Sequence, residues 1–274
     1  MSVIKYKNCT WVGEIKDGEP YGKGKLTYKY GDVFTGSIKY KNKDLWNGNG
    51  TYIYADNGSV YEGKLKNAMK DGKGSIKWKT GYVYTGMFKE DIVNGHGIFN
   101  ALERGKYIGM WKEAERHGKG KEIKINGDSY DGEWVEDSKH GYGVLTYNAS
   151  KKRSNHWNKD RIINRSDFES GVIYAGMFVK NRLHGQGTAT WTDGKKYTGM
   201  WKNSLKHGKG KEIKANGDEY DGEWENDLPH GYGIRKFKDG RKWEGTWKMG
   251  QMVGEGTIYI PINIKKSTCS LPKI

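Results

Sequence analysis

Aromatic, glycine and apolar positions recur along this chain in a fixed order, with polar residues between them. The unit reads Tyr-x-Gly-x-Trp, crosses a polar turn, and resumes with His-Gly-x-Gly before an apolar residue and an aromatic one. Most successive copies are 23 residues apart, which is typical of a repeat array. The first aromatic of each copy is Trp11, Phe34, Tyr61, Tyr84, Tyr107, Tyr130, Tyr174, Tyr197, Tyr220 and Trp243.

Each unit predicts one β-hairpin. Residues one, three and five of the unit share a face of the first strand, because side chains alternate along a strand. In the second strand the two glycines share a face with the next apolar residue and aromatic. Since glycine has no Cβ, we expect a neighbour's ring to lie flat in the slot it leaves. The predicted repeat-packing residues are Tyr130, Gly132, Trp134, Gly141, Gly143, Tyr220, Gly222, Trp224, Gly231 and Gly233.

The composition favours many short strands and argues against a deep hydrophobic core. The apolar class is only 34% of the chain, while 41 glycines accompany 11 Trp, 19 Tyr and 6 Phe, with no collagen period. Asn-Gly and Asp-Gly pairs near Gly127, Gly194, Gly217 and Gly240 predict the turns that join one hairpin to the next.

The pattern resembles the MORN (membrane occupation and recognition nexus) repeat family. The resemblance rests on the Tyr-x-Gly-x-Trp and His-Gly-x-Gly segments and covers about residues 11–260. It implies an all-β fold: an elongated, twisted single-layer antiparallel sheet of about ten successive hairpins in a solenoid-like array. It also implies a scaffold or interaction module, in some members linked to membranes and phospholipids. The resemblance further implies that the repeat is not catalytic, and because it covers nearly all of these residues we expect no enzyme domain among them.

The repeats divide the chain into five segments. We expect an N-terminal cap at residues 1–10, six repeats at 11–148, a basic insertion at 149–170, four repeats at 171–260, and a tail at 261–274. The insertion carries more basic than acidic residues. Long loops in compact arrays are usually functional or disordered, and a tolerated surface insertion is the other interpretation.

A three-repeat block is duplicated, since residues 84–147 resemble 174–237 at an offset of 90. Two repeats in these blocks, at 107–129 and 197–219, place Glu122 and Glu212 where an apolar residue usually stands. We expect a local register change or bulge that turns Ile123 and Ile213 inward. The alternative is that these positions are simply exposed.

No catalytic, cofactor or metal residue is predicted. Five histidines precede the Gly-x-Gly pair in successive copies, but strand spacing places equivalent residues roughly 10 Å apart, too far for metal ligands bonded at about 2.1 Å. The Gly-x-Gly pairs precede no helix, so they are not phosphate loops. Cys9 and Cys269 form no metal spacing, and the N-terminus has no apolar signal core. We therefore expect an intracellular, cytoplasmic protein, either peripheral at a membrane or within a larger assembly.

Partner choice should lie on the face opposite the glycines. Met and Tyr patches there are typical of adaptable binding surfaces, unless the chain's own tail or insertion covers them. The candidate partner-binding residues are Met87, Met110, Tyr142, Val144, Met177, Met200, Tyr232 and Ile234. We expect Tyr142 with Val144, and Tyr232 with Ile234, to lie near the methionines.

The net charge of +15 points to anionic partners, although basic charge also serves solubility. The candidate anion- or lipid-binding residues are Lys119, Lys121, Lys151, Lys152, Arg153, Lys209 and Lys211. The leading hypothesis is a non-enzymatic scaffold that binds proteins or itself. A peripheral module for acidic phospholipids is the alternative. Nucleic-acid binding is a third, disfavoured because repeat packing uses most of the aromatics.

Overall fold

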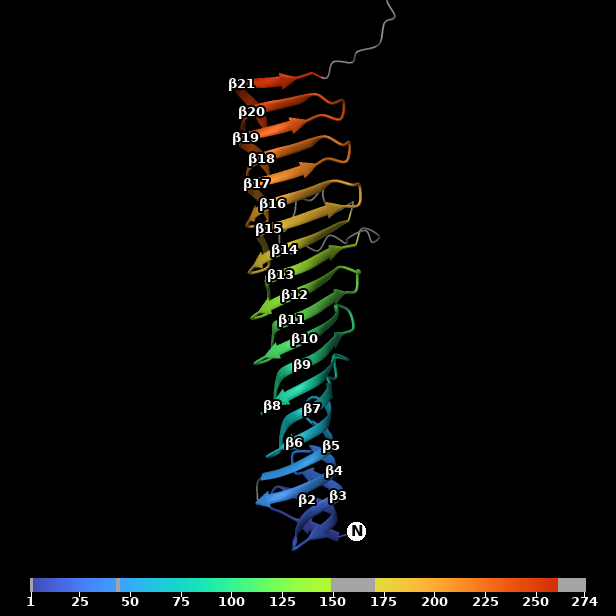
Figure 1. The fold of residues 1–274 in the computed structure, drawn as a ribbon. Helices are drawn as coiled ribbons and strands as arrows, with labels where there is room; N and C mark the ends of the chain where they lie inside the picture. Colours follow the sequence, from blue (N-terminus) through green and yellow to red (C-terminus); the bar gives the residue numbers. More distant parts are fainter. Residues whose placement is uncertain (1, 43–44, 149–170, 261–274) are drawn as a thin grey trace, which may run out of the picture. The chain divides into compact units, whose positions relative to one another are not determined.

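The computed structural model describes residues 2–42, 45–148 and 171–260 (Figure 1). The chain divides into a first unit, Met1–Lys151 with Phe178–Asn181, and a second unit, Lys152–Met177 with Arg182–Ile274. Strands and turns make up these described ranges, which contain no helix. The predicted insertion at 149–170 and the tail at 261–274 lie outside them, and so do Lys151, Lys152 and Arg153.

The strands follow the repeat in sequence. In the first unit they are β1 (Ser2–Lys5), β2 (Cys9–Lys16), β3 (Glu19–Tyr28), β4 (Val33–Asn42), β5 (Leu45–Ile53), β6 (Val60–Lys66), β7 (Met69–Lys77), β8 (Val83–Lys89), β9 (Ile92–Ala101), β10 (Gly105–Lys112), β11 (Glu115–Lys124), β12 (Ser129–Val135) and β13 (Ser138–Tyr147). The remaining strands are β14 (Val172–Val179), β15 (Arg182–Trp191), β16 (Lys196–Lys202), β17 (Leu205–Ile213), β18 (Glu219–Glu225), β19 (Leu228–Lys236), β20 (Lys242–Lys248) and β21 (Gln251–Tyr259).

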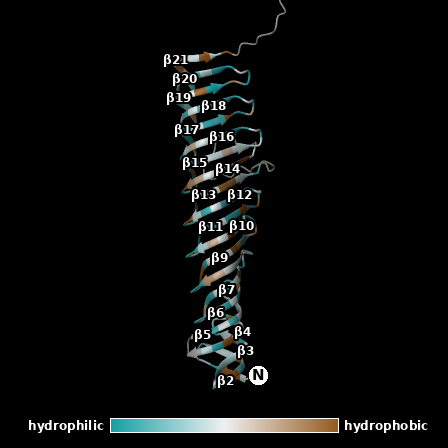
Figure 2. Ribbon diagram, viewed as in Figure 1, coloured by the Kyte–Doolittle hydropathy of each residue, from teal (hydrophilic) through white to brown (hydrophobic). Residues whose placement is uncertain are grey.

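Each strand pairs antiparallel with the one before it, from β1 to β13 in the first unit. The same holds from β15 to β21 in the second unit. Strands β2 to β21 come as ten successive pairs in the order of the repeats (Figure 1). The prediction of an all-β array of successive hairpins is confirmed. Hydrophobic and hydrophilic residues are interspersed along the strands (Figure 2).

The hairpin of β12 and β13 shows how a repeat is built. Glu136 and Asp137 form its two-residue turn with φ of 48° and 60°, the positive values of a type I′ turn. Gly132 pairs with Gly143 and Glu133 with His140, so β13 carries two extra residues there. An even number of extra residues preserves the alternation of faces. The His-Gly-x-Gly segment is therefore a bulge that keeps every aromatic on one side, here named the inner face.

On the inner face the first aromatic of each repeat lies over the glycines of its own hairpin. Tyr130 is fully buried, and a Cβ on Gly132 or on Gly143 would lie 2.5 Å from its ring or hydroxyl. The Tyr130 hydroxyl donates a hydrogen bond to the carbonyl of Glu133 at 2.9 Å. A ring therefore fills the glycine slot as expected, and the neighbour that supplies it is the aromatic two residues earlier on the same strand.

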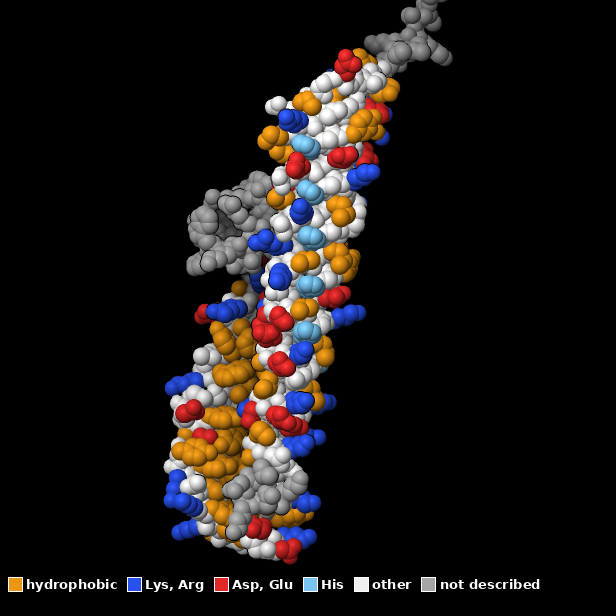
Figure 3. Space-filling model, turned by 90° about the vertical axis from the view of Figure 1, so that its left-hand side faces the viewer, with side chains coloured by type: hydrophobic (Ala, Val, Ile, Leu, Met, Phe, Trp, Pro, Cys, Tyr) orange, Lys and Arg blue, Asp and Glu red, His pale blue; other side chains and the backbone are white. Residues whose placement is uncertain are grey.

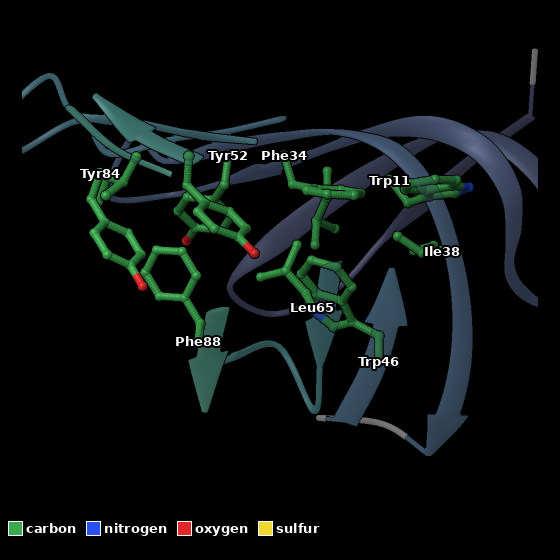
Figure 4. Close-up of a cluster of buried hydrophobic side chains, with 11 residues drawn as sticks. Trp11, Phe34, Ile38, Trp46, Tyr52, Leu65, Tyr84 and Phe88 are labelled. Atoms are coloured by element: carbon green, nitrogen blue, oxygen red, sulfur yellow. The ribbon is translucent and has the colours of Figure 1, made fainter. Parts of the chain in front are cut away.

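The aromatic at position five links one hairpin to the next. Trp134 contacts Tyr130 and Tyr107 edge to face, with centroids 5.1 and 5.4 Å apart, an arrangement that aromatic pairs prefer. Its indole N–H donates to the carbonyl of Gly120 at 3.0 Å, in the preceding repeat. Trp201, Trp224 and Trp247 make the equivalent bonds in the second unit. In the second and third repeats of the first unit the position-five residues are Ile38 and Leu65, which join the rings of Phe34 and Trp46 in one buried cluster (Figure 4).

The turn of each hairpin also binds the hairpin before it. Asp137 accepts a hydrogen bond from the backbone N–H of Arg116 at 3.0 Å, and its own N–H donates to the carbonyl of Arg116 at 3.1 Å. Asp227 repeats this exchange with Lys206 in the second unit, at 2.8 and 3.1 Å. Adjacent hairpins are thus joined at both the ring layer and the turn.

The predicted register change beside Ile123 and Ile213 was wrong. Glu122 pairs with Tyr130, and Glu212 with Tyr220, in unbroken register. Both carboxylates therefore point to the inner face, and Ile123 lies on the opposite face. The alternative of simple exposure also fails for Glu212, which is 6% exposed. Basic side chains of the inner face pair with these carboxylates, so no shift of register is needed.

Removing the buried hydroxyl isolates one contact of the repeat. Tyr130→Phe should lower the free energy of unfolding by about 1 kcal/mol, because the Glu133 carbonyl loses its donor in a dry site. Tyr142→Phe, at an exposed outer position, should change it little. Urea unfolding followed by circular dichroism measures both, and equal effects of the two substitutions would contradict the assignment.

The buried tyrosines make the fold sensitive to alkali. Burial raises the pKa of Tyr84 and Tyr107 to about 12, because it disfavours the phenolate. In the unfolded chain tyrosines ionise near pH 10, so above that pH the unfolded state binds fewer protons than the folded one. The melting temperature should hold below pH ~10 and fall between pH ~10 and ~12. Absorbance of phenolate at increasing pH should show the buried rings ionising together with unfolding, and independent ionisation would argue against it.

Candidate functional site

The outer face, opposite the aromatic rings, carries the predicted methionines. Met110 pairs with His96 on one side and His117 on the other. It is 41% exposed, as is Met177 in the second unit, while Met87 and Met200 are partly buried. Met87 and Met110 belong to adjacent repeats of the first unit, so they face the same side one hairpin apart.

The tyrosines of the outer face do not join the methionines. Tyr142 is 56% exposed on β13, three strands from Met110 on β10. Between them lie Lys119 and Glu133, which pair across β11 and β12. Lys209 and Glu223 separate Met200 from Tyr232 in the same way. The expected proximity of tyrosines and methionines was wrong, because a whole polar strand pair intervenes in each block.

Two isoleucines that the repeat pattern did not single out extend the methionine surface. Ile98 on β9 pairs with Ile108 on β10, both on the outer face. Ile98 is 36% exposed. We name Met87, Ile98, Ile108 and Met110 the outer patch. The sequence does show apolar residues at outward positions of adjacent strands. It does not show that Ile98 and Ile108 lie opposite each other, because that depends on the strand register. Figure 3 shows hydrophobic side chains gathered in a band over the first unit and a column of histidines along the strands, without identifying single residues of the outer patch.

The second block has no isoleucine pair beside its outer-face methionines. At an offset of 90, Thr188 and Thr198 replace Ile98 and Ile108, and their hydroxyls lie 3.1 Å apart. Val144 pairs with Asp131, and Ile234 with Asp221, so these predicted residues are flanked by carboxylates. Tyr232 donates to Glu244 at 2.5 Å. The duplicated blocks share a frame but present different outer faces.

The predicted anion-binding lysines of the array face carboxylates. Lys121 lies 3.4 Å from Asp131, and Lys211 lies 2.8 Å from Glu219. Lys119 pairs with Glu133, and Lys209 with Glu223, across the strands. Two lysines on the outer edge of the first unit have an apolar residue and not a carboxylate opposite them. Lys66 pairs with Met69, and Lys89 pairs with Ile92.

The MORN repeat family model matches residues 11–33, 42–59, 61–81, 107–129, 130–149, 174–196, 197–219, 220–240 and 243–263. These stretches cover well over half of the chain. The chain belongs to the MORN repeat family. No curated protein matches it.

One MORN repeat escapes the family match. Residues 82–106 fall between two matched stretches, yet β8 and β9 form a hairpin there with the same glycine pair and the same bulge. This structural repeat carries Met87 and Ile98 of the outer patch. Over the ranges that the structure describes, no helix has the length and apolarity needed to cross a membrane.

The inner face of each MORN block holds one ionic cluster. Glu122 pairs with Arg116 at 2.9 Å and lies 3.9 Å from Lys139. In the second unit Glu212 accepts a short hydrogen bond from the Lys206 ammonium, and Lys195 lies 3.8 Å away. Burial lowers the pKa of Lys206. Arg116 and Lys206 also lie over Trp134 and Trp224, at 4.2 and 4.6 Å from the ring centroids.

The contacts of these clusters indicate a structural role, because the charged groups pair with one another beside the tryptophan rings. Their acidic and basic groups engage one another within the ring layer. Across residues 2–42, 45–148 and 171–260, no three His, Cys, Asp or Glu side chains are grouped to hold a metal ion.

Glu212→Gln should be strongly destabilising, by about 3–5 kcal/mol, because the nearly buried Lys206 loses its carboxylate. Glu122→Gln is the matched change in the first block. It should cost less, because Arg116 keeps its pair with Asp137 at 2.7 Å. Chemical denaturation of the two variants compares them, and a larger loss for Glu122→Gln would refute the ranking.

Proposed function

We propose that this MORN protein is a non-enzymatic scaffold that binds protein partners through the outer patch of its first unit. The observation that carries the proposal is the pairing of Ile98 with Ile108 beside Met110. Exposed apolar side chains on adjacent strands form a surface that water solvates poorly, and such surfaces are typical of interaction sites. Methionine adds a flexible, polarisable side chain that adapts to different partners.

The strand register shows that the outer patch is small, because polar residues pair with its isoleucines on both sides. Thr85 pairs with Ile98, and Lys121 pairs with Ile108 on the far side. A small apolar centre with a polar rim is the common anatomy of a protein interface. Self-association through two copies of this patch is one form of the same proposal. An interaction module without catalysis also agrees with the general character of MORN repeats.

The outer patch can be tested against its own duplicate. Ile98→Lys with Met110→Lys should abolish partner capture or self-association, because each lysine places a charge in the interface centre. Thr188→Lys with Met200→Lys makes the equivalent change in the second block and should leave binding intact. Pull-downs and analytical ultracentrifugation measure the two outcomes. Unchanged assembly in the first variant, with the fold retained by circular dichroism, would refute the outer patch.

A peripheral membrane module for acidic phospholipids is the second candidate. Lys66 and Lys89 favour it, because their cross-strand neighbours are Met69 and Ile92 and not carboxylates, and Lys89 lies two residues from Met87 on β8. A basic residue close to an anionic membrane contributes about 1 kcal/mol. Flotation with vesicles containing phosphatidylserine, at low and high salt, distinguishes the candidates. Binding that salt weakens would favour the membrane, and absence of flotation would leave the protein partner.

Nucleic-acid binding receives less support. Base stacking needs exposed aromatic rings, whereas the first aromatic of each repeat is buried over its glycines.

A further inference from the structure

The inner face of the first unit contains a depression. A depression of ≈ 560 Å³ opens between Trp78, Phe99 and Trp111, with Arg104 and Glu122 among its lining residues. Its volume falls within the ≈ 300–1,000 Å³ of ligand sites. Ala101 and Gly105 also line it. Phe99, Ala101 and Arg104 of its lining belong to the repeat that the family model does not match, and the depression lies on the face opposite the outer patch.

The duplicated block shows what fills this space. At an offset of 90, Trp191 stands for Ala101 and Lys195 for Gly105. Trp191 is 3% exposed, and the Lys195 ammonium lies 4.5 Å from the centroid of its ring. Tyr107, Trp111, Arg116 and Glu122 correspond to Tyr197, Trp201, Lys206 and Glu212, whereas Ala189 stands for Phe99. The second block therefore places a small residue and then an indole where the first block has Phe99 and then Ala101, and the depression is the space beside Phe99 that the small Ala101 side chain leaves.

Backbone geometry keeps the space open. Gly105 has a φ of 107°, and a Cβ there would collide with the carbonyl oxygen of Ile123. Gly105 is also paired with Ala101 on one side and Lys124 on the other. A side chain at position 105 would disturb both pairings, so that position cannot fill the depression, and the size of residue 101 decides whether the space is occupied.

The charge available at the depression is positive. Glu122 and Asp137 are both engaged by Arg116, at 2.9 and 2.7 Å. Arg104 lies at the rim, exposed, and no ion pair or hydrogen bond joins its guanidinium to any residue that the structure describes. Guanidinium groups bind carboxylates in a bidentate geometry. An occupant with a carboxylate beside its ring would satisfy Arg104, whereas a cation there would be repelled.

We infer that the depression binds an aromatic side chain of a partner protein, flanked in the partner's sequence by Asp or Glu. The ring lies between Trp78, Phe99 and Trp111, in the space beside the small Ala101 side chain, at the position where the second block carries the indole of Trp191. The neighbouring carboxylate pairs with Arg104. The inference rests on the proposed function of the protein as an interaction module, and it gives that module a second, chemically defined contact on the inner face.

Capped peptides test the occupant on the full chain. Acetyl-Trp-Glu-amide should bind with a measurable Kd by isothermal titration calorimetry. Acetyl-Trp-Lys-amide should bind at least ~10-fold more weakly, since each tenfold is ~1.4 kcal/mol of charge discrimination. Acetyl-Leu-Glu-amide should show no saturable binding. Indole-3-propionate supplies the same chemistry as a free small molecule. Equal or tighter binding of that compound would overturn the assignment to a protein segment.

Two variants locate the site. Ala101→Trp should remove peptide binding, because its indole fills the depression as Trp191 does. Arg104→Glu, at an exposed position that leaves the fold intact, should reverse the preference from the glutamate to the lysine peptide. Binding that survives Ala101→Trp in a folded protein, or a preference unmoved by Arg104→Glu, would overturn the inference.

The outer-face variant separates this result from the proposed function. Ile98→Lys with Met110→Lys lies on the other face and should leave peptide binding unchanged. Loss of partner capture in that variant with peptide binding retained supports both contacts. Failure of peptide binding alone removes the inner-face contact and leaves the outer patch standing.

Discussion

The contact on which this structure depends is that of one aromatic ring with two glycines. Tyr130 lies over Gly132 of its own strand and Gly143 of the next, where no Cβ can be accommodated. Its hydroxyl reaches a backbone carbonyl at 2.9 Å, so the ring is fixed at both ends. A single hairpin is marginal in water. The ring layer gives each hairpin an apolar surface on which the next can stack, which allows a sheet of this kind to form without a second layer.

Because the ring contacts and ion pairs described above lie within one hairpin or between it and the next, a polar substitution in the ring layer can be compensated locally. Glu122 and Glu212 stand at apolar positions, and the basic residue six positions before each supplies the opposing charge. Such pairs are weak sources of stability, since desolvation offsets their attraction, but removing one partner is costly. The ionic clusters are therefore best understood as substitutions that neighbouring charges make tolerable, and the stability of the array stays with the rings.

The duplicated blocks separate what maintains the array from what distinguishes its parts. Tyr107 and Tyr197, with Trp111 and Trp201, keep the same edge-to-face contacts in both units. Around this constant frame, Ile98 becomes Thr188 on the outer face and Ala101 becomes Trp191 on the inner face. Ile98 of the outer patch and Ala101 of the inner depression both lie on β9. Partner recognition on a repeat frame of this kind is expected where the copies differ.

The sequence by itself determined the hairpins, their order and the two faces, because a strict alternation around paired glycines admits one arrangement of strands. It did not determine the register beside Glu122, since a glutamate at an inward position can be avoided by a bulge or neutralised by a cation, and only Arg116 in space decides. The pairing of Ile98 with Ile108, the polar strands between Met110 and Tyr142, and the depression above Gly105 were likewise decided by tertiary structure. Each involves residues that meet only when neighbouring strands are placed side by side in a fixed register.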